Sequence, residues 1–269
     1  MPPKHVQGST ARIIITGNRA AKIYRGNDEN FQRECNVLRR LGRHPNVVEL
    51  LDVQLEDRTL VLQAGRCLRE ILQEGERDMD ISDERQEKWV SGLACGLQYV
   101  HDNNIIHADL NAANVIISGD DHDVAMWLDF GGSQIDDQEA LANYDEYSYR
   151  PPEFPDDPPV SRATDIFAFG CTVFEIETGA PPFYHETKHM SQAGKMSYLE
   201  DKYRQRLYPS VENLRFGRII MGCWEGRYES MNDLNQDLNS MDVQRSQPLS
   251  WYDSIPAMRT AIRNGLRRF

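Results

Sequence analysis

The stretch "HADLNAANV", residues 107–115, decides the fold, because it places an aspartate five residues before an asparagine in an apolar neighbourhood. Two apolar runs follow, "NVIIS" and "AMWLDF", which flank the polar turn "GDDHD" and predict a β-hairpin. A further carboxylate, Asp129, ends the second run in "LDFGGS". Asp109 and Asn114 by themselves are typical of residues that cap a helix or a turn, so their interpretation depends on Asp129.

If the hairpin forms, Asn114 and Asp129 lie at neighbouring ends of paired strands, where one hard cation can bridge them. Oxygen ligands with room for water and phosphate oxygens favour Mg²⁺. Asp109 then stands nearby as a base or as an orienting group for a hydroxyl. The three residues together predict a magnesium site with a separate carboxylate beside it.

The N-terminal part predicts strands and one helix. "ARIII" and "RAAKIY" are joined by the turn "TGN" and predict a hairpin. Apolar residues at helical spacing from Phe31 to Leu41 predict a helix that stops at Gly42, and the runs "VVELLDVQL" and "RTLVLQAG" predict further strands. Glu34 lies on the apolar face of that helix. Because an unpaired buried charge is costly, Glu34 is expected to have a partner.

Helices dominate the remainder of the chain. Ser82 is the predicted N-cap of a helix over "DERQEKWVSGLACGLQYVHDN". "ATDIFAFGCTVFEIETG" is apolar nearly all round, which is typical of a helix buried inside a larger lobe. Because strands come first and helices mostly later, the expected fold class is α+β with two lobes.

The composition is that of one large domain or of two lobes with a common interface, with 269 residues of which 40% are hydrophobic. No apolar run is long enough to span a bilayer, and "MPPKHVQGST" lacks the apolar core of a signal peptide, so an intracellular, cytoplasmic location is expected. Five scattered cysteines without a CxxC pair are typical of reduced thiols, not of a zinc or disulfide framework.

The formal net charge of −12 argues against nucleic acid as a partner, since like charges repel. The tail differs, because from Met241 onward five arginines stand against two aspartates, a net of +3. Its stretch "IPAMRTAIRNGLRRF" predicts a basic amphipathic helix. We expect it to pack on the acidic body of the chain, and docking on a partner such as calmodulin or a membrane surface is the alternative.

The order of these motifs resembles that of a eukaryotic-type protein kinase. Lys22 stands in "AAKIY", Glu34 in the next helix, then come "HADLNAAN", "DFG" at 129–131, "PPE" at 151–153, Asp165 in "DIFAFG" and Arg227 in "CWEGRYESM". The resemblance covers roughly residues 6–240. It implies a bilobal protein-kinase-like fold with a kinase domain over 4–240. The β-rich N-lobe would span about 4–65 and the larger helical C-lobe about 66–240, followed by a basic tail over 241–269.

The resemblance also implies ATP and Mg²⁺ as cofactors, a protein as substrate and a role for each matching residue. Lys22 would contact the phosphates and be held by Glu34. Asp109 would receive or orient the proton of the substrate hydroxyl, while Asn114 and Asp129 would bind Mg²⁺. The remaining ATP-binding positions would be Gly8, Gln63 and Gly65, and the structural positions His107, Glu153, Asp165 and Arg227.

Some residues depart from the family pattern. Of the glycine-rich loop, "VQGSTARI" keeps only Gly8. Ala108 replaces the arginine that reads a phosphorylated activation segment. Asn111 stands where serine/threonine kinases carry a lysine, and Ala113 where many tyrosine kinases carry an arginine. Losing one such transition-state contact predicts a rate penalty of roughly 10² to 10³.

Two interpretations therefore stay open. The first is an active kinase that phosphorylates serine or threonine in a protein, and the second is a catalytically impaired pseudokinase that acts as a scaffold or binding module. A kinase for small molecules has no need of the peptide-platform features "YRPPE" and Arg227. "HETKH", residues 185–189, matches a zinc-protease motif, but it lacks the usual extension and an exposed helix is expected there.

Overall fold

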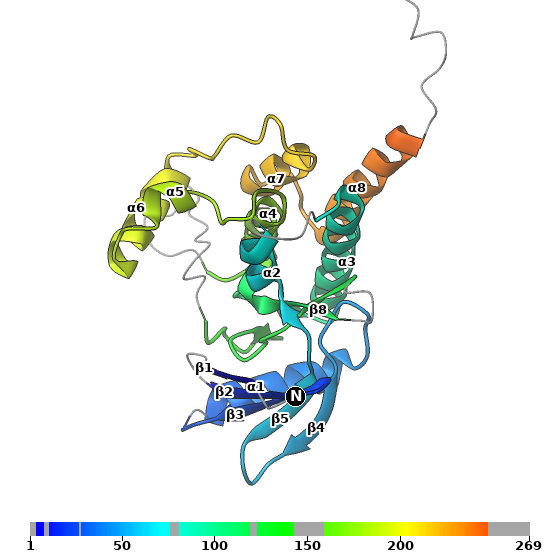
Figure 1. Cartoon of the computed structure of the whole chain (residues 1–269), viewed down its shortest axis with the longest axis vertical. Coiled ribbons are helices and arrows are strands. Elements are labelled where there is room, and N and C mark those ends of the chain that lie inside the picture. Colours follow the sequence, from blue (N-terminus) through cyan, green and yellow to red (C-terminus); the bar gives the residue numbers. More distant parts are fainter. Residues whose placement is uncertain are drawn as a thin grey trace, which may run out of the picture. The chain divides into compact units, whose positions relative to one another are not determined.

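The computed structural model describes residues 4–7, 11–26, 28–75, 81–118, 123–142 and 159–246 (Figure 1). The N-terminal part is a five-stranded antiparallel sheet in the order β1-β2-β3-β5-β4. Its strands are β1 (Lys4–Gln7), β2 (Ala11–Thr16), β3 (Arg19–Tyr24), β4 (Leu50–Gln54) and β5 (Thr59–Gln63). The predicted hairpin is confirmed, because β2 pairs with β3 from Ala11 opposite Tyr24 to Thr16 opposite Arg19.

Helix α1 (Asp28–Leu41) connects β3 to β4 and has the predicted apolar face. Phe31, Leu38 and Leu41 are buried. The helix stops at Gly42, whose φ of +58° is favourable only without a side chain. Glu34 lies on the buried face and is 0% exposed. Periodicity therefore predicted both the helix and the unusual burial of this carboxylate.

The middle of the chain carries the second predicted hairpin. Its elements are β6 (Arg66–Cys67), α2 (Leu68–Gly75), α3 (Asp83–Asp102), β7 (Ile105–Ile106), a 3₁₀ turn (Ala112–Asn114), β8 (Val115–Ser118), β9 (Val124–Trp127) and β10 (Gln134–Ile135). Ser82 caps α3, since its side chain accepts from the Arg85 N–H. Strands β8 and β9 pair antiparallel, with Val115 opposite Trp127. The hairpin on which the magnesium prediction depends is thus present.

The remaining described helices are α4 (Arg162–Thr178), α5 (Tyr184–Thr187), α6 (Gln192–Arg204), α7 (Gly217–Trp224) and α8 (Met231–Ser246). Every residue of α4 from Thr164 to Ile176 is buried, as its all-round apolar sequence predicted. Helix α4 packs beside α7 (Figure 1). Gly170 allows this close approach of the two helices, because a Cβ added there would lie 2.5 Å from the Cβ of Cys223. The α+β prediction, strands first and helices later, is confirmed.

The chain divides into two compact units, residues 1–235 and 236–269. All side chains discussed below belong to the first unit. The predicted tail helix, "IPAMRTAIRNGLRRF", lies outside the described residues. Within the described parts of the chain, no helix has the length and apolar character needed to span a membrane.

Candidate functional site

A buried cluster joins β3, α1 and the segment after β9. The Nζ atom of Lys22 lies 2.7 Å from Oε2 of Glu34 and 2.7 Å from Oδ1 of Asp129. The side chains of Lys22 and Glu34 are 5% and 0% exposed, whereas that of Asp129 is 36% exposed. Two carboxylates from different parts of the sequence thus contact the Lys22 ammonium. The partner expected for Glu34 is Lys22.

The electrostatics of this cluster leave it with excess negative charge. Burial lowers the pKa of Lys22, but the carboxylates of Asp129 and Glu34 outweigh burial and hold that pKa well above its ordinary value. For Asp129 burial raises the pKa, and the nearby Lys22 outweighs it, so the net shift is downward. Burial raises the pKa of Glu34, which Lys22 only partly opposes. With both carboxylates ionised, one cation serves two anions, so the cluster favours a further cation.

Asp165, at the start of α4, holds the backbone of the stretch that precedes Asp109. Its Oδ2 accepts from the His107 N–H at 2.8 Å, and its Oδ1 accepts from the Ala108 N–H at 3.0 Å. The ring of His101 lies against the same carboxylate, with Nε2 2.8 Å from Oδ2. Ala108 has a φ of +69°, a conformation that costs roughly 1–3 kcal/mol in a residue with a side chain. The contacts from Asp165 keep this strained turn in place.

His107 is fully buried and connects two parts of the site. Its Nε2 donates to the carbonyl of Leu128 at 3.0 Å, and its Nδ1 accepts from the Asp109 N–H at 3.3 Å. These two bonds need a neutral ring with its proton on Nε2. Burial, the largest influence, lowers the pKa of His107 and favours that form. Both ring nitrogens are used in these contacts, so the geometry favours a structural role over metal binding.

Two amides orient the carboxylate of Asp109. Asn114 Nδ2 donates to the carbonyl of Asp109 at 2.8 Å and to its Oδ2 at 2.9 Å. Asn111 Nδ2 lies 3.3 Å from Oδ1 of the same aspartate. Asn111 also caps the 3₁₀ turn, because its Oδ1 accepts from the Ala113 N–H at 2.9 Å. A neutral amide therefore contacts Asp109 at the position where the resemblance implies a lysine.

The donor set of Asn114 and Asp129 fits Mg²⁺. The amide nitrogen of Asn114 is used by Asp109, which leaves its carbonyl oxygen as the atom suited to a hard cation. The N–H of Leu128 donates to the backbone carbonyl of Asn114 at 3.1 Å, so the residue before Asp129 is tied to Asn114. Asp129 itself has a φ of +66°. Oxygen ligands on neighbouring strand ends and the excess negative charge both favour a divalent cation here.

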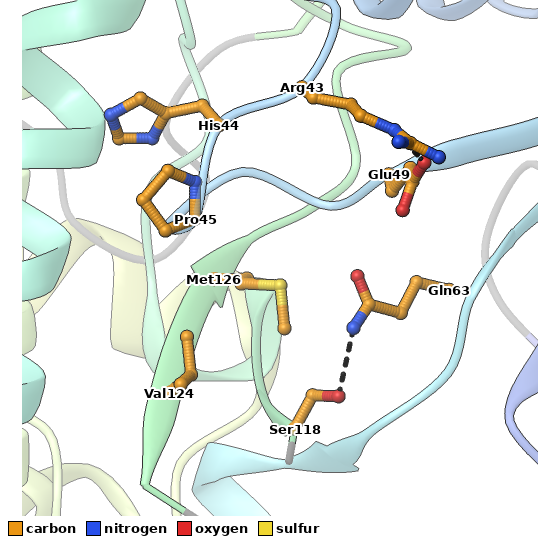
Figure 2. A pocket seen from close by; sticks show the side chains of 8 residues that line it. All are labelled: Arg43, His44, Pro45, Glu49, Gln63, Ser118, Val124 and Met126. Atoms are coloured by element: carbon orange, nitrogen blue, oxygen red, sulfur yellow. Dashed lines mark hydrogen bonds and ion pairs between the residues drawn. The ribbon is translucent and has the colours of Figure 1, made fainter.

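Gln63 and Gly65 lie at the end of β5 and just beyond it. The side chain of Gln63 donates from Nε2 to Oγ of Ser118 at 3.0 Å and lines a cavity of about 460 Å³ (Figure 2). The other lining residues are Arg43, His44, Pro45, Glu49, Ser118, Val124 and Met126. None of the five residues Lys22, Glu34, Asp109, Asn114 and Asp129 lines it. A Cβ at Gly65 would lie 2.7 Å from the carbonyl oxygen of Ile117, so glycine fits the close approach to β8.

The remaining predicted site residues are Gly8, Glu153 and Arg227. Gly8 and Glu153 lie outside the described residues, as does the tyrosine-rich stretch 144–149. The side chain of Arg227 is 47% exposed, and its Nε lies 3.1 Å from Oε2 of Glu225. This exposure differs from the buried pair expected for Arg227. Its pairing with Glu153 stays a prediction.

The "HETKH" segment forms α5 and the residues after it. His185, Glu186 and His189 are exposed. In the described parts of the chain, no group of three or more His, Cys, Asp or Glu side chains is placed to hold a metal. This geometry gives the zinc alternative no support.

Sequence reasoning missed several residues that contact the cluster or the segment after Asp129. The hydroxyl of Tyr24 donates to Oε2 of Glu34. Asn30 Nδ2 donates to the Gly131 carbonyl at 2.9 Å, and Arg33 donates to the carbonyls of Ser133 and of Glu139, the latter at 2.8 Å. Strand alternation could have found Tyr24, because residues two apart lie on the same face of β3 as Lys22. Only the folded chain shows the contacts of Asn30 and Arg33.

Comparison with known proteins agrees with this geometry. Residues 11–245 match the family model of the protein kinase domain. The chain is 28% identical over 213 residues to the serine/threonine-protein kinase mos of Patiria pectinifera, covering 74% of this chain and 58% of that protein. It is 28% identical over 190 residues to the calcium/calmodulin-dependent protein kinase type 1 of Macrobrachium nipponense, covering 67% and 53%.

A third relative is the inhibitor of nuclear factor kappa-B kinase subunit alpha of Xenopus laevis, 29% identical over 206 residues, covering 72% of this chain and 28% of that protein. The chain thus spans less than two thirds of the length of each of these relatives. The family match nevertheless covers most of this sequence, and the β-rich part followed by a helical part is the bilobal arrangement of that family. The chain belongs to the protein kinase domain family.

Proposed function

We propose that this protein binds ATP together with Mg²⁺ and transfers the γ-phosphoryl group to a serine or threonine hydroxyl of a protein substrate. The observation that carries the proposal is the position of Lys22, which contacts Glu34 and Asp129 at the same time. Activity in this family requires the lysine–glutamate pair and the metal-binding aspartate to be in place together. In this chain Lys22 contacts both Glu34 and Asp129, which supports the proposal.

Each residue has a distinct task in the proposed reaction. Lys22 holds the phosphates, and Glu34 keeps its ammonium in place. Asn114 and Asp129 hold Mg²⁺, which supplies positive charge beside the phosphate oxygens when bound. Once the Asp129 carboxylate binds a cation, its attraction for Lys22 weakens, so the ammonium can turn toward phosphate while Glu34 retains it. Asp109, fixed by two amides, accepts or orients the proton of the substrate hydroxyl.

The backbone supplies the proposed adenine contacts. Because the side chain of Gln63 lines a separate cavity, Gln63 and Gly65 would contact the nucleotide through main-chain atoms. Gly8 would approach the phosphates with its N–H. The structural roles of His107, Asp165, Glu153 and Arg227 complete the assignment, and Glu153 would reach Arg227 from the segment before α4.

A pseudokinase is the alternative function, and the Asn111 amide favours it. At this position the chain offers Asp109 a neutral donor at 3.3 Å instead of a cation. Without that cation, charge that develops on the transferred phosphoryl group is less stabilised. Such a chain would retain nucleotide binding and act as a scaffold.

We also propose the domain bounds 4–240, with the tail over 241–269 docking on its own domain or on a partner protein. An intracellular location agrees with the need for ATP and with the five free cysteine thiols.

The first experiment is a thermal-shift titration of the purified protein with ATP, with Mg²⁺ and again with EDTA. A ligand that binds only the folded state at a hundredfold excess over Kd adds about 2.7 kcal/mol to the unfolding free energy. A Mg²⁺-dependent rise supports the nucleotide site. The absence of a shift up to millimolar ATP contradicts it.

Phosphoryl transfer is then measured on a mixture of protein substrates, with the variant Asp109→Asn as the matched control. Loss of a general base lowers the rate by roughly 10² to 10⁴, while Mg²⁺–ATP binding should persist because Asp109 binds neither group. Wild-type binding without any transfer would favour the pseudokinase. Equal turnover in wild type and variant would remove Asp109 from the role proposed for it.

A further inference from the structure

Tyr24 lies at the centre of the lysine cluster although no sequence motif pointed to it. It follows Lys22 by two residues on β3 and is 3% exposed. Its ring packs edge-on against Phe31 of α1, with centroids 5.8 Å apart, and the Lys22 ammonium lies 5.2 Å from the ring centroid. These contacts alone describe a core aromatic residue. The contacts of the Tyr24 hydroxyl indicate a role beyond packing.

The hydroxyl donates to Oε2 of Glu34, the same oxygen that Lys22 contacts. Oε1 of Glu34 accepts from the Phe130 N–H at 3.3 Å. Glu34 is wholly buried, and the Lys22 ammonium beside it is shared with Asp129. A buried carboxylate with only part of a cation needs other donors to remain stable. Tyr24 provides one of them.

The Tyr24 hydroxyl also lies close to the segment that starts at Asp129. A Cβ added at Gly131 would lie 3.1 Å from the Tyr24 oxygen. The carbonyl of Gly131 is bound in turn by Asn30 of α1 at 2.9 Å. One hydroxyl therefore stands where β3, α1 and residues 129–131 meet. Glycine at 131 keeps the space that the oxygen needs.

We propose that Tyr24 is a positioning residue for Lys22. Its hydroxyl holds the Glu34 carboxylate in the orientation that retains the Lys22 ammonium, and it continues to do so when Lys22 leaves Asp129 for a phosphate oxygen. The inference rests on the proposed nucleotide-binding function and deepens it. If Tyr24 only filled the core, removing its hydroxyl would change the kinetics and Mg²⁺–ATP binding little.

The test compares Tyr24→Phe, Glu34→Gln and the double variant, each in the chain of 269 residues. Tyr24→Phe removes one oxygen and keeps the ring contact with Phe31. The matched control is Tyr208→Phe, because the Tyr208 hydroxyl donates to the Trp224 carbonyl at 2.8 Å, among the later helices. Steady-state kinetics give KM for ATP and kcat, and thermal shifts give Mg²⁺–ATP binding.

We expect Tyr24→Phe to lower kcat/KM for ATP by roughly tenfold, mostly through KM, since hydrogen bonds to charged groups are the stronger ones. Glu34→Gln should have a larger effect, and the double variant should be no worse than Glu34→Gln because Tyr24 acts through Glu34. Tyr208→Phe should match wild type. The proposal is overturned if Tyr24→Phe has the same kinetics as Tyr208→Phe. It is also overturned if the loss of kcat/KM in the double variant equals the product of the losses in Tyr24→Phe and Glu34→Gln.

A second readout needs neither nucleotide nor activity. The rate at which an amine-reactive acylating reagent modifies Lys22, measured by peptide mass spectrometry, reports how firmly its ammonium is held. We expect slow modification in wild type, the fastest in Glu34→Gln, and an intermediate rate in Tyr24→Phe. If Tyr24→Phe reacts like wild type, or neither variant reacts faster, the positioning role is wrong. If wild type binds no nucleotide while this order holds, the proposed function fails and the role of Tyr24 stands.

Discussion

Two carboxylates in this protein, Asp165 and Asp129, have opposite surroundings. Asp165 is 0% exposed and accepts from two backbone N–H groups and lies against the His101 ring. Asp129 is 36% exposed and shares the ammonium of Lys22 with Glu34. Asp165 is thus satisfied by fixed donors of the fold, whereas the Lys22 cluster carries more negative than positive charge. The comparison favours a stabilising role for Asp165 and supports the proposal that Asp129 binds a cation.

The largest effect that tests this comparison is expected at Asp165. Asp165→Ala leaves two buried N–H groups and the His101 ring without their acceptor. Removing one partner of a buried charged network costs about 3–5 kcal/mol, so the unfolding free energy in urea should fall by that amount. Asp165→Asn keeps one carbonyl acceptor and should lose less. If Asp165→Ala kept the stability of the wild type, Asp165 would not be a stabilising residue, and the contrast with Asp129 would fail.

Asp129→Asn should have the opposite pattern. The unfolding free energy of the ligand-free protein should fall only slightly, because ionised Asp129 is stabilised by Lys22 but the asparagine keeps an acceptor oxygen for that ammonium. The Mg²⁺-dependent stabilisation by ATP, about 2.7 kcal/mol at a hundredfold excess over Kd in wild type, should be lost. Both quantities come from thermal unfolding with and without Mg²⁺–ATP. A large loss of ligand-free stability would show that Asp129 is a structural residue after all.

The variant Asn111→Lys tests whether the neutral amide beside Asp109 limits the rate. It returns a cation to the side of Asp109 and should raise turnover by roughly tenfold, a part of the transition-state contact that the chain lacks. It also removes the cap on the 3₁₀ turn, which costs about 1 kcal/mol of stability. Asn111→Ser keeps a short capping oxygen without a cation, and it serves as the control in rate and stability measurements. No rise in turnover would mean that the missing cation does not limit the rate.

The smallest effect concerns His107, which lies between the two carboxylates. Burial lowers its folded-state pKa below the ordinary value of 6.5. The unfolded chain therefore binds the proton more readily, so stability is complete above about pH 6.5 and declines as the pH falls below it. Unfolding free energies between pH 5 and 8 should show this decline. His107→Gln should reduce this decline in stability. Burial also lowers the pKa of His44, so the variant His44→Gln measures how much His44 contributes to the same decline.

Much of the local structure could be predicted from short patterns. The turn "TGN" predicted the β2–β3 hairpin, the spacing from Phe31 to Leu41 predicted α1, and Ser82 predicted the start of α3. Each of these signals acts over a few residues, so the sequence shows it directly. The burial of Glu34 was visible in the same way, since it interrupts an apolar helix face.

The partners of the site residues could be predicted only where a family pattern named them. Lys22 and Asp129 are 107 positions apart, and no local rule joins them. The contact of Asn111 with Asp109, the exposure of Arg227 and the position of the Gln63 side chain beside Ser118 differ from what the resemblance alone implies. Packing decides such contacts, because a side chain takes the donor or acceptor that neighbouring elements bring near.

Spacing and the family resemblance together led us to propose Lys22, Asp109 and Asp129 as the residues with chemistry. The sequence by itself determined the order of strands and helices, the two hairpins and the buried α4. These depend on periodicity, turn residues and charge, which the chain carries locally. The tertiary structure alone decided that one lysine serves two carboxylates and that Tyr24 supports one of them. The physical reason is that buried charges must be satisfied by whatever groups the completed fold places around them.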